Sequence, residues 1–334
     1  MTIRERLEAD EKTNLSQYAT LSVCSRGRDN EEAECDIRPV FQRDRDRILH
    51  SKSFRRLKDK TQVFLAPEGD HYRTRLTHTL EVSQNARTIA KALRLNEELA
   101  EAIALGHDLG HTPFGHAGER ALDAVCPLGF KHNEQSLRMV EVLEKDGQGL
   151  NLTWEVRDGI LNHQMESMPA SLEGKIVRFS DKIAYIHHDM DDAIRAGILT
   201  EEDVPESIRE VLGGTCGDRL DHFIHDIVTN SLDKNDICMS PETTYAMTEL
   251  RRFMFRRVYQ NPIAKAEEGK AEDMIEKLYN YYLQHENMLP TYLLDLEKKG
   301  EYREKIVCDY VSAMTDHFAM MKYEEIFIPK SWHF

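Results

Sequence analysis

Hydrophobic residues recur every three to four positions from about residue 40 to residue 322, and this spacing predicts amphipathic helices. Alternating β-branched runs are scarce, and the best strand candidate is the short stretch 324–332. The pattern therefore predicts an all-α protein whose first forty residues, together with 212–218, are loop-like. The expected helices span about 81–95, 97–109, 134–145, 153–164, 173–196, 218–233, 241–260, 270–286 and 299–322.

The helices at 81–95 and 97–109 are separated by a recognisable start signal. Asn96 precedes two glutamates, which is typical of an N-cap followed by acids in the first helical turn. Pro113 and Gly115 then interrupt the periodicity just after the second helix. Because only a short turn joins the two helices, we expect them to pack antiparallel.

Groups that bind metals or move protons gather where the second helix ends. The stretch LGHDLGHTPFGHAGE, residues 105–119, holds three histidines, one aspartate and one glutamate. His107 and Asp108 are adjacent, so both side chains can reach one ion at a helix end. Antiparallel packing would bring His78, at the start of the preceding helix, near them. Asp181 lies among apolar residues, where a carboxylate is costly unless it is paired or metal-bound.

Two imidazoles and two carboxylates suit a divalent ion such as Mn, Fe, Co, Ni or Zn, and Mg in the presence of phosphate. Taken alone, each of these residues has a simpler explanation as a cap or as a satisfied core residue. The set as a whole, in the order His, His-Asp, Asp, resembles the HD-domain superfamily of metal-dependent phosphohydrolases. In that superfamily the metal ligands occur in this order, which would make His78, His107, Asp108 and Asp181 the ligands.

The composition of the chain limits which partners it can bind and in which cell compartment we expect it. Among the 334 residues, Lys and Arg number 44 and Asp and Glu 59, a net charge of −15, which disfavours coating of nucleic acid or binding to an anionic membrane. No run of about twenty apolar residues occurs, and charges stand where a signal peptide needs an apolar region. We therefore expect a cytoplasmic protein without a membrane partner. The six scattered cysteines form no CxxC pair and are given no role.

Longer strings are similar to one bacterial family, the deoxyguanosinetriphosphate triphosphohydrolase-like proteins. The resemblance implies a multi-helix HD-domain fold with additional C-terminal helices. It also implies hydrolysis of a deoxynucleoside triphosphate to the deoxynucleoside and inorganic triphosphate with a divalent metal ion. The similar strings are residues 41–64, 71–93, 101–122, 130–144, 150–161, 172–199 and 309–319.

On this basis we expect an N-terminal extension at 1–40 and an HD phosphohydrolase core at 41–200. Residues 201–334 would form a helical C-terminal region that completes the substrate pocket and offers an oligomer interface. The boundary near residue 200 has no linker signal, so a single domain is the alternative.

The resemblance also assigns proton-transfer residues. Departure of a 5′-alkoxide requires protonation, and His116 is the general acid by resemblance. Glu119, three residues later, is spaced to hold the ring of His116 if the segment is helical. His111 and His132 match family positions in the same pocket, although supporting or capping roles would suit them equally.

A triphosphate also needs cations. Between residues 43 and 60 there are eight Arg or Lys and three Asp, although a solvated helix face with internal salt bridges would give the same composition. By resemblance, phosphate contacts come from Arg75, Lys182, Tyr185 and Arg251. The residues expected near the sugar or base are Gln62, Asp189, Tyr259 and Gln260, with Gln62 and Asp189 at the 3′-hydroxyl and Tyr259 excluding a ribose.

Two other functions fit part of the pattern. One is an HD-type 5′-deoxynucleotidase, which has no need for contacts to distal phosphates. The other is a non-enzymatic nucleotide sensor, or a protein that binds single-stranded nucleic acid, in which the metal ion is only structural. A structural ion needs the ligands but not His116 and Glu119, so the presence of both residues favours an enzyme. The family further implies a homo-oligomer and a nucleotide activator, while no string identifies the preferred base.

Overall fold

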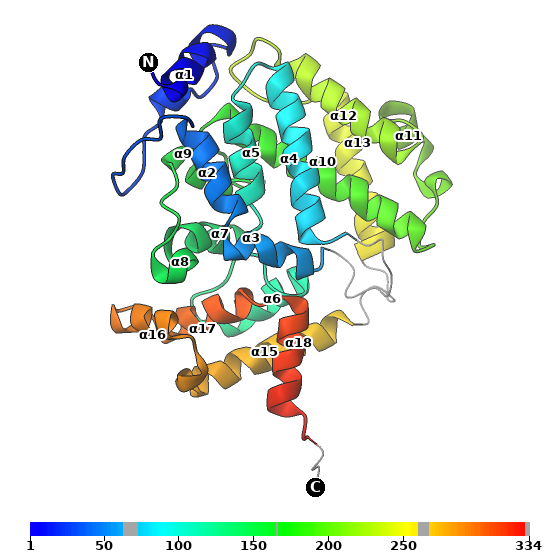
Figure 1. The fold of residues 1–334 in the computed structure, drawn as a ribbon. Coiled ribbons are helices and arrows are strands. Elements are labelled where there is room, and N and C mark those ends of the chain that lie inside the picture. The colour runs from blue at the N-terminus through cyan, green and yellow to red at the C-terminus, as the bar shows by residue number, and fades with distance from the viewer. Residues whose placement is uncertain (63–72, 165, 260–266, 331–334) are drawn as a thin grey trace.

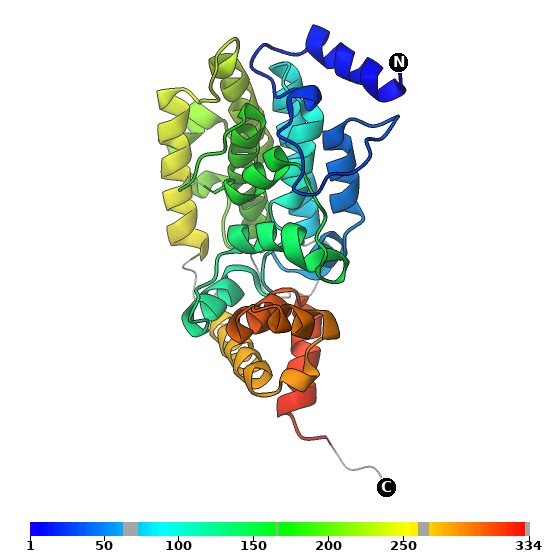
Figure 2. The ribbon, with the colours of Figure 1, turned by 90° about the vertical axis from the view of Figure 1, so that its left-hand side faces the viewer.

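The computed structural model describes residues 1–62, 73–164, 166–259 and 267–330, and it is built from helices. In these ranges there is no strand, and the single β-bridge joins Thr61 to Thr74. The predicted all-α class is confirmed. Figures 1 and 2 show an upper bundle, which carries the N-terminus, and a lower layer of helices, which carries the C-terminus.

The upper bundle surrounds two antiparallel helices. α4 (Arg75–Ala92) and α5 (Glu97–Gly106) are joined by residues 93–96, and the Asn96 side chain caps α5 by accepting from the Leu99 amide at 3.2 Å. The long α10 (Leu172–Arg195) packs against both of them. The remaining elements of this bundle are α2 (Val40–Leu49), α3 (Lys52–Arg56), η2 (Leu57–Asp59), α9 (Trp154–Leu161), η4 (Glu201–Asp203), α11 (Glu206–Leu212), α12 (Cys216–Ser231), α13 (Pro241–Met254) and the short π-helix η5 (Phe255–Tyr259).

The lower layer begins with a helix that follows the histidine-rich stretch. α6 (Gly115–Val125) packs against α15 (Glu268–Gln284), so the C-terminal segment covers the end of the bundle (Figure 1). The other elements of this layer, together with those that connect it to the upper bundle, are α7 (His132–Arg138), the short π-helix η3 (Met139–Leu143), α8 (Glu144–Gly147), η6 (Glu286–Met288), α16 (Thr291–Lys298), α17 (Arg303–Ser312) and α18 (Asp316–Phe327).

The N-terminal segment differs from its predicted loop. α1 (Ile3–Asn14) is a helix whose only buried residue is Glu8, so it lacks the apolar stripe from which helices were predicted. Polar contacts define it instead: Thr2 and Glu5 form a capping box, and Arg4 bonds Glu8 one turn later. Between α1 and the short η1 (Ser22–Cys24), the segment is fixed to the bundle. One such contact is the carboxylate of Glu173, which accepts from Thr20.

Several predicted boundaries are also wrong. The expected helix 299–322 is two helices, because Thr315 caps a new helix by accepting from the Phe318 amide at 3.2 Å. The strand expected at 324–332 is absent where the structure describes this stretch, since α18 continues to Phe327. The loop at 212–218 shortens to residues 213–215, between α11 and α12. The helix expected at 241–260 changes at Phe255 into η5, and Gln260 lies outside the described residues.

None of the helices in the described part of the chain is both long and apolar enough to cross a membrane.

Candidate active site

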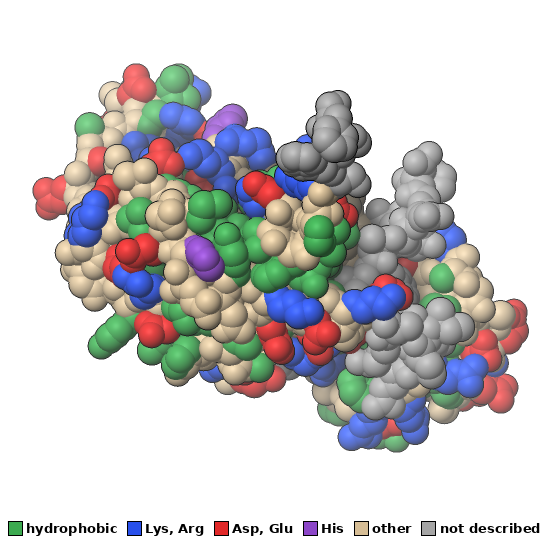
Figure 3. All heavy atoms as spheres, turned by 90° about the horizontal axis from the view of Figure 1, so that it is seen from below, with side chains coloured by type: hydrophobic (Ala, Val, Ile, Leu, Met, Phe, Trp, Pro, Cys, Tyr) green, Lys and Arg blue, Asp and Glu red, His purple; other side chains and the backbone are tan. Residues whose placement is uncertain are grey.

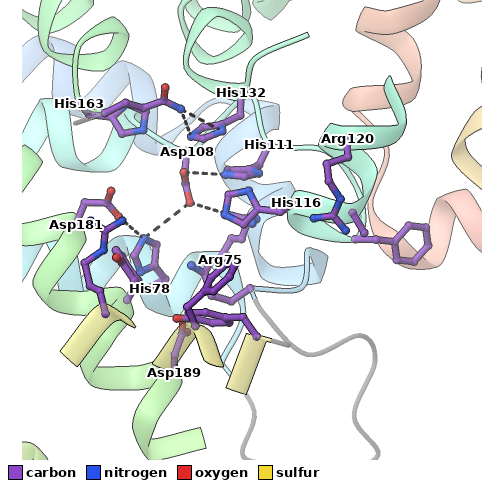
Figure 4. A pocket seen from close by; sticks show the side chains of 18 of the residues that line it. Arg75, His78, Asp108, His111, His116, Arg120, His132, His163, Asp181 and Asp189 are labelled. Atoms are coloured by element: carbon purple, nitrogen blue, oxygen red, sulfur yellow. Dashed lines mark hydrogen bonds and ion pairs between the residues drawn. The ribbon is translucent and has the colours of Figure 1, made fainter. Parts of the chain in front are cut away.

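Four of the predicted residues meet where α4, α5 and α10 converge, and we call them the floor cluster: His78, His107, Asp108 and Asp181. His78 lies on the first turn of α4, His107 and Asp108 in the turn after α5, and Asp181 in the middle of α10. The Nε2 atom of His78 is 3.1 Å from Oδ1 of Asp181 and 3.9 Å from Oδ2 of Asp108. The Nε2 atom of His107 is 3.5 Å from Oδ1 of Asp108 and 3.7 Å from Oδ1 of Asp181. Figure 4 shows His78 between the side chains of Asp108 and Asp181.

The ring of His107 is oriented by its own helix. Its Nδ1 donates to the carbonyl of Ala104 at 2.7 Å, which leaves Nε2 as the ligand-competent atom. That Nε2 is buried without a hydrogen-bond partner among the described residues, although two carboxylates lie near it. A buried polar atom left without a partner is costly unless a ligand satisfies it. The floor cluster, with two imidazoles and two carboxylates, therefore fits a divalent metal ion.

The electrostatics of the floor cluster keep its carboxylates ionised. Burial alone would raise the pKa of Asp108, but the neighbouring His107, His111 and Arg75 hold it well below the usual value. Burial would raise the pKa of Asp181 too, but the hydrogen bond from His78 and the charges of the neighbouring histidines together lower it. Ionised carboxylates are the form that a metal ion requires.

A second group of side chains is organised by Glu119. α6 is helical at this point, so His116 and Glu119 lie one turn apart, and His116 Nδ1 is 3.1 Å from the Glu119 carboxylate. The same carboxylate accepts from Nδ1 of His132 at 2.8 Å and from its backbone amide at 2.9 Å. The ring of His132 stacks on His111 with centroids 4.0 Å apart. Burial opposes ionisation of Glu119, yet the bonds from His116 and His132 lower its pKa well below the usual value.

The loop that leads into α6 is held by the C-terminal helices. Phe114, at φ 61°, and Gly115, at φ 57°, form a left-handed turn, and the Phe114 amide donates to the carboxylate of Asp316 at 3.0 Å. Buried Lys60 donates to the backbone carbonyls of His111 and, at 2.8 Å, of Ser312. Burial lowers the pKa of Lys60 to about 7. The end of α17 and the start of α18 thus fix the backbone that presents His111 and His116.

A cavity of about 500 Å³ opens beside both groups. The basic residues between 43 and 60 are not among the described residues that line it. Most of them pair with acids instead, as Arg45 does with Glu98 and Arg47 with Glu32. The residues predicted to bind substrate that do line it are Gln62, Arg75, Tyr185, Asp189, Arg251 and Tyr259. Lys182 lies beside them rather than in the lining, and Gln260 falls outside the described residues.

The wall formed by α10 and α13 carries both charge and aromatic rings. The guanidinium of Arg251 lies 6.0 Å from the centroid of the Tyr185 ring, and burial together with Arg251 lowers the pKa of Lys182 to about 8. Burial raises the pKa of Asp189 to about 7, and the Tyr259 hydroxyl donates to this carboxyl group. Asp192, one turn further along α10, is also buried and is paired with Arg73 at 2.9 Å.

The cavity also contains residues that the sequence did not single out. His163 and Gln164 enter from the loop after α9, and Gln164 lies 3.1 Å from Nε2 of His132. Arg120, on α6, pairs with Glu268 and Glu272 of α15 at 2.6 Å each. The periodicity of the sequence does not predict these positions, since each residue reaches the cavity only through packing against a distant helix.

On the underside of the molecule, basic and acidic side chains are mixed. The described part of that face has no patch of purely positive or purely negative charge (Figure 3).

Comparisons with known proteins agree with this arrangement. Residues 75–186 match the HD domain and residues 237–325 match the phosphohydrolase-associated domain. A deoxyguanosinetriphosphate triphosphohydrolase-like protein of Caldanaerobacter subterraneus subsp. tengcongensis is 56% identical over 333 residues, which are 99% of this chain and 98% of that protein. One from Clostridium perfringens strain 13 is 50% identical, with 99% of both chains covered.

A solved structure supports the fold. A phosphohydrolase from Bacteroides thetaiotaomicron, at 17% identity, superposes with a TM-score of 0.53 over 84% of this chain and 69% of that one. The HD domain and the floor cluster together indicate a divalent metal ion. The chain belongs to the deoxyguanosinetriphosphate triphosphohydrolase-like family of HD-domain proteins.

Proposed function

We propose that the protein is a metal-dependent deoxynucleoside triphosphate triphosphohydrolase, which converts a dNTP and water into a deoxynucleoside and inorganic triphosphate. The observation that carries the proposal is one cavity lined jointly by the floor-cluster residues other than His107, by His116 and by the cations Arg75 and Arg251. A phosphate ester placed there would meet a metal site, a proton donor and positive charge at once. The names of the similar proteins support the same reaction.

The floor cluster would hold the ion, with His78, His107, Asp108 and Asp181 as its ligands. When bound, a divalent ion supplies Lewis-acid polarisation of a phosphoryl oxygen and activates water for attack. The donor set accommodates Mn, Mg, Fe, Co or Ni, and we propose Mn or Mg for the first tests. We further propose a cytoplasmic homo-oligomer that accepts a nucleotide activator.

His116 would protonate the departing 5′-oxygen. Glu119 accepts from its Nδ1, which fixes the ring and leaves Nε2 available for the proton transfer. The same carboxylate holds His132, so His111 and His132 would complete the wall on this side of the reacting phosphorus. A positioned general acid contributes roughly 10²- to 10⁴-fold to a rate.

Substrate contacts follow from the charges of the other wall. Arg75, Lys182 and Arg251 would neutralise the triphosphate, and Tyr185 would pack beside it. The pair formed by Asp189 and Tyr259 would face the sugar, with Gln62 near the 3′-hydroxyl. Because Asp189 is buried and hydrogen-bonded to the half-buried Tyr259, an additional 2′-hydroxyl would have to displace this pair, which supports a preference for deoxyribose.

Product analysis tests the proposal. Protein loaded with Mn, and then with Mg, is incubated separately with dGTP, dATP, dCTP, dTTP and GTP, and products are separated by chromatography. Deoxynucleoside with intact triphosphate is the expected result, and the relative rates rank the bases. Orthophosphate released from deoxynucleoside monophosphates alone would indicate the 5′-deoxynucleotidase. No hydrolysis of single nucleotides or of their mixtures would indicate the nucleotide sensor.

A further inference from the structure

We propose that His188, a buried histidine of α10, positions the metal ligand His78 by accepting a hydrogen bond from its Nδ1 atom. The two rings are in edge-to-face contact, with centroids 4.8 Å apart and planes at 89°. His188 is not among the described residues that line the cavity, and the sequence did not single it out. The inference rests on the proposed function, since it assigns a positioning residue to the metal site of that reaction.

Helical spacing places the residues involved on facing sides of α4 and α10. His78 and Glu81 are three residues apart on α4, and so they lie on one face of that helix. Asp181 and His188 are seven apart, which is two turns along one face of α10. Because the two helices pack together, the Nε2 atom of His78 lies 3.1 Å from Asp181, and its ring also meets His188. The imidazole of His78 is therefore held between a ligand carboxylate and a second imidazole.

A bound ion would change what the Nδ1 atom of His78 requires. Coordination uses the lone pair of Nε2, so the ring proton must then reside on Nδ1. This Nδ1 is buried, and it has no hydrogen-bond partner among the described residues. His107 meets the same requirement through the carbonyl of Ala104. Since a buried donor is costly without an acceptor, His78 needs one from a neighbouring side chain.

His188 offers that acceptor. Its Nδ1 donates to the carboxylate of Glu81 at 3.0 Å, which fixes the tautomer and leaves a lone pair on Nε2. This Nε2 is also buried, and nothing in the described part of the chain hydrogen-bonds it. Glu81 is held in turn by Arg73 at 2.9 Å, so the acceptor is oriented before an ion arrives. Two touching rings thus each carry one buried nitrogen without a partner, one that must donate when the ion binds and one that can accept.

Asp189 is the competing partner of His188. Its Oδ1 lies 3.4 Å from Nε2 of His188, yet neither atom forms a hydrogen bond with any described group. We favour His78 because coordination obliges its Nδ1 to donate, whereas Asp189 already shares a hydrogen bond with Tyr259. The two partners predict different defects. Loss of a bond to His78 weakens metal binding, and loss of a bond to Asp189, which would face the sugar, raises KM for a dNTP.

The affinity for Mn tests the inference without relying on turnover. The full-length protein is stripped with EDTA and titrated with Mn in the absence of nucleotide, and the EPR signal of free Mn gives the dissociation constant. His188→Phe keeps a ring but removes the acceptor, and we expect it to bind Mn roughly 10- to 100-fold more weakly, the usual effect of losing the partner of a ligand histidine. His188→Gln retains an acceptor oxygen and should recover most of that loss. His222→Phe, the same substitution at a half-buried histidine of α12 that bonds Thr243, is the matched control and should keep the wild-type affinity.

Each result bears on the proposal. Wild-type Mn affinity in folded His188→Phe, or equal losses in His188→Phe and His188→Gln, would overturn it. A raised KM with unchanged Mn affinity would overturn it as well and would make Asp189 the partner of His188.

The fold of each variant is verified by circular dichroism. If His188→Phe does not fold, Glu81→Ala replaces it, because the Glu81 side chain is 34% exposed and its removal releases the tautomer of His188. Weaker Mn binding is expected there too, and unchanged affinity would contradict the inference. Wild-type protein that binds Mn but hydrolyses no dNTP would refute the proposed function alone, whereas wild-type affinity in these variants would refute the role of His188 alone.

Discussion

The two sides of the cavity are built in opposite ways. The floor cluster is largely buried, and its groups are oriented before any substrate arrives, as the bond from His107 to Ala104 illustrates. We call the opposite side the rim, and it consists of the exposed lining residues His116, Arg120, Arg251 and Phe255. The side chain of His116 is 68% exposed, against 5% for Asp108. Buried charges must be satisfied by the fold itself, whereas exposed ones stay hydrated until a ligand replaces water.

This difference predicts two kinds of variant. Changes in the floor cluster should alter metal content and the pH dependence of stability. Changes in the rim should leave metal and fold intact and alter turnover or substrate affinity. The four predictions below test that division.

The largest effect is expected from the floor cluster. Asp181→Ala should lose the ion, because it removes a carboxylate that lies 3.7 Å from Nε2 of His107, and turnover should fall below detection. Metal analysis and a dNTP assay measure both results. Asp191→Ala, on the same helix but paired with Arg73 and Arg195, is the control and should keep its metal. Unchanged metal content in Asp181→Ala would remove this residue from the ligand set.

On the rim, His116→Ala should keep metal and fold but lose about 10²- to 10⁴-fold in kcat, the usual contribution of a general acid. The side chain is exposed, so its removal leaves no cavity in the core. Metal content, thermal melting and steady-state kinetics are compared with His225→Ala, which changes another exposed histidine. Normal turnover in His116→Ala would show that another group delivers the proton.

Between floor and rim, Asp189 should make stability depend on pH. Its folded pKa of about 7 lies above the ordinary 3.8, because burial disfavours the carboxylate. The folded state therefore binds the proton more tightly than the unfolded state. The stabilisation that this proton gives is complete below about pH 4 and is lost as the pH rises to 7. Asp189→Asn should remove this pH-dependent change in the free energy of unfolding, which is roughly 4 kcal/mol at most. Urea unfolding in EDTA measures it, and equal slopes in both proteins would contradict the prediction.

The smallest effect is expected from a single phosphate contact. Arg251→Ala should raise KM for a dNTP roughly tenfold to a hundredfold with little change in kcat, since a hydrogen bond to a charged group contributes about 1.5–3 kcal/mol. Arg252→Ala is the neighbouring control, because Arg252 pairs with Glu249 at the entrance of a different groove. Equal KM values in the two variants would place the triphosphate elsewhere.

The sequence predicted much of the fold and less of the cavity. Periodicity found α4, α5, α10, α12, α13 and α15, because each has an apolar face that packs on the core. It did not list α2 and α6, although both bury apolar residues, and it missed α1, which has no such face. It also merged α17 with α18, where one capping threonine separates two helices with similar spacing. Motif order also singled out the four residues of the floor cluster, which the fold brings within 4 Å of one another in pairs.

The all-helical class, the family and the chemical groups of the floor cluster can thus be predicted from the amino-acid sequence. Which distant residues share the cavity depends on how the helices pack. His163 and Gln164 arrive because α9 packs on α5, and Lys60 is buried because α17 ends against it. The physical reason is that local spacing specifies which face of a helix is buried, but the element that covers this face depends on the packing of the whole chain.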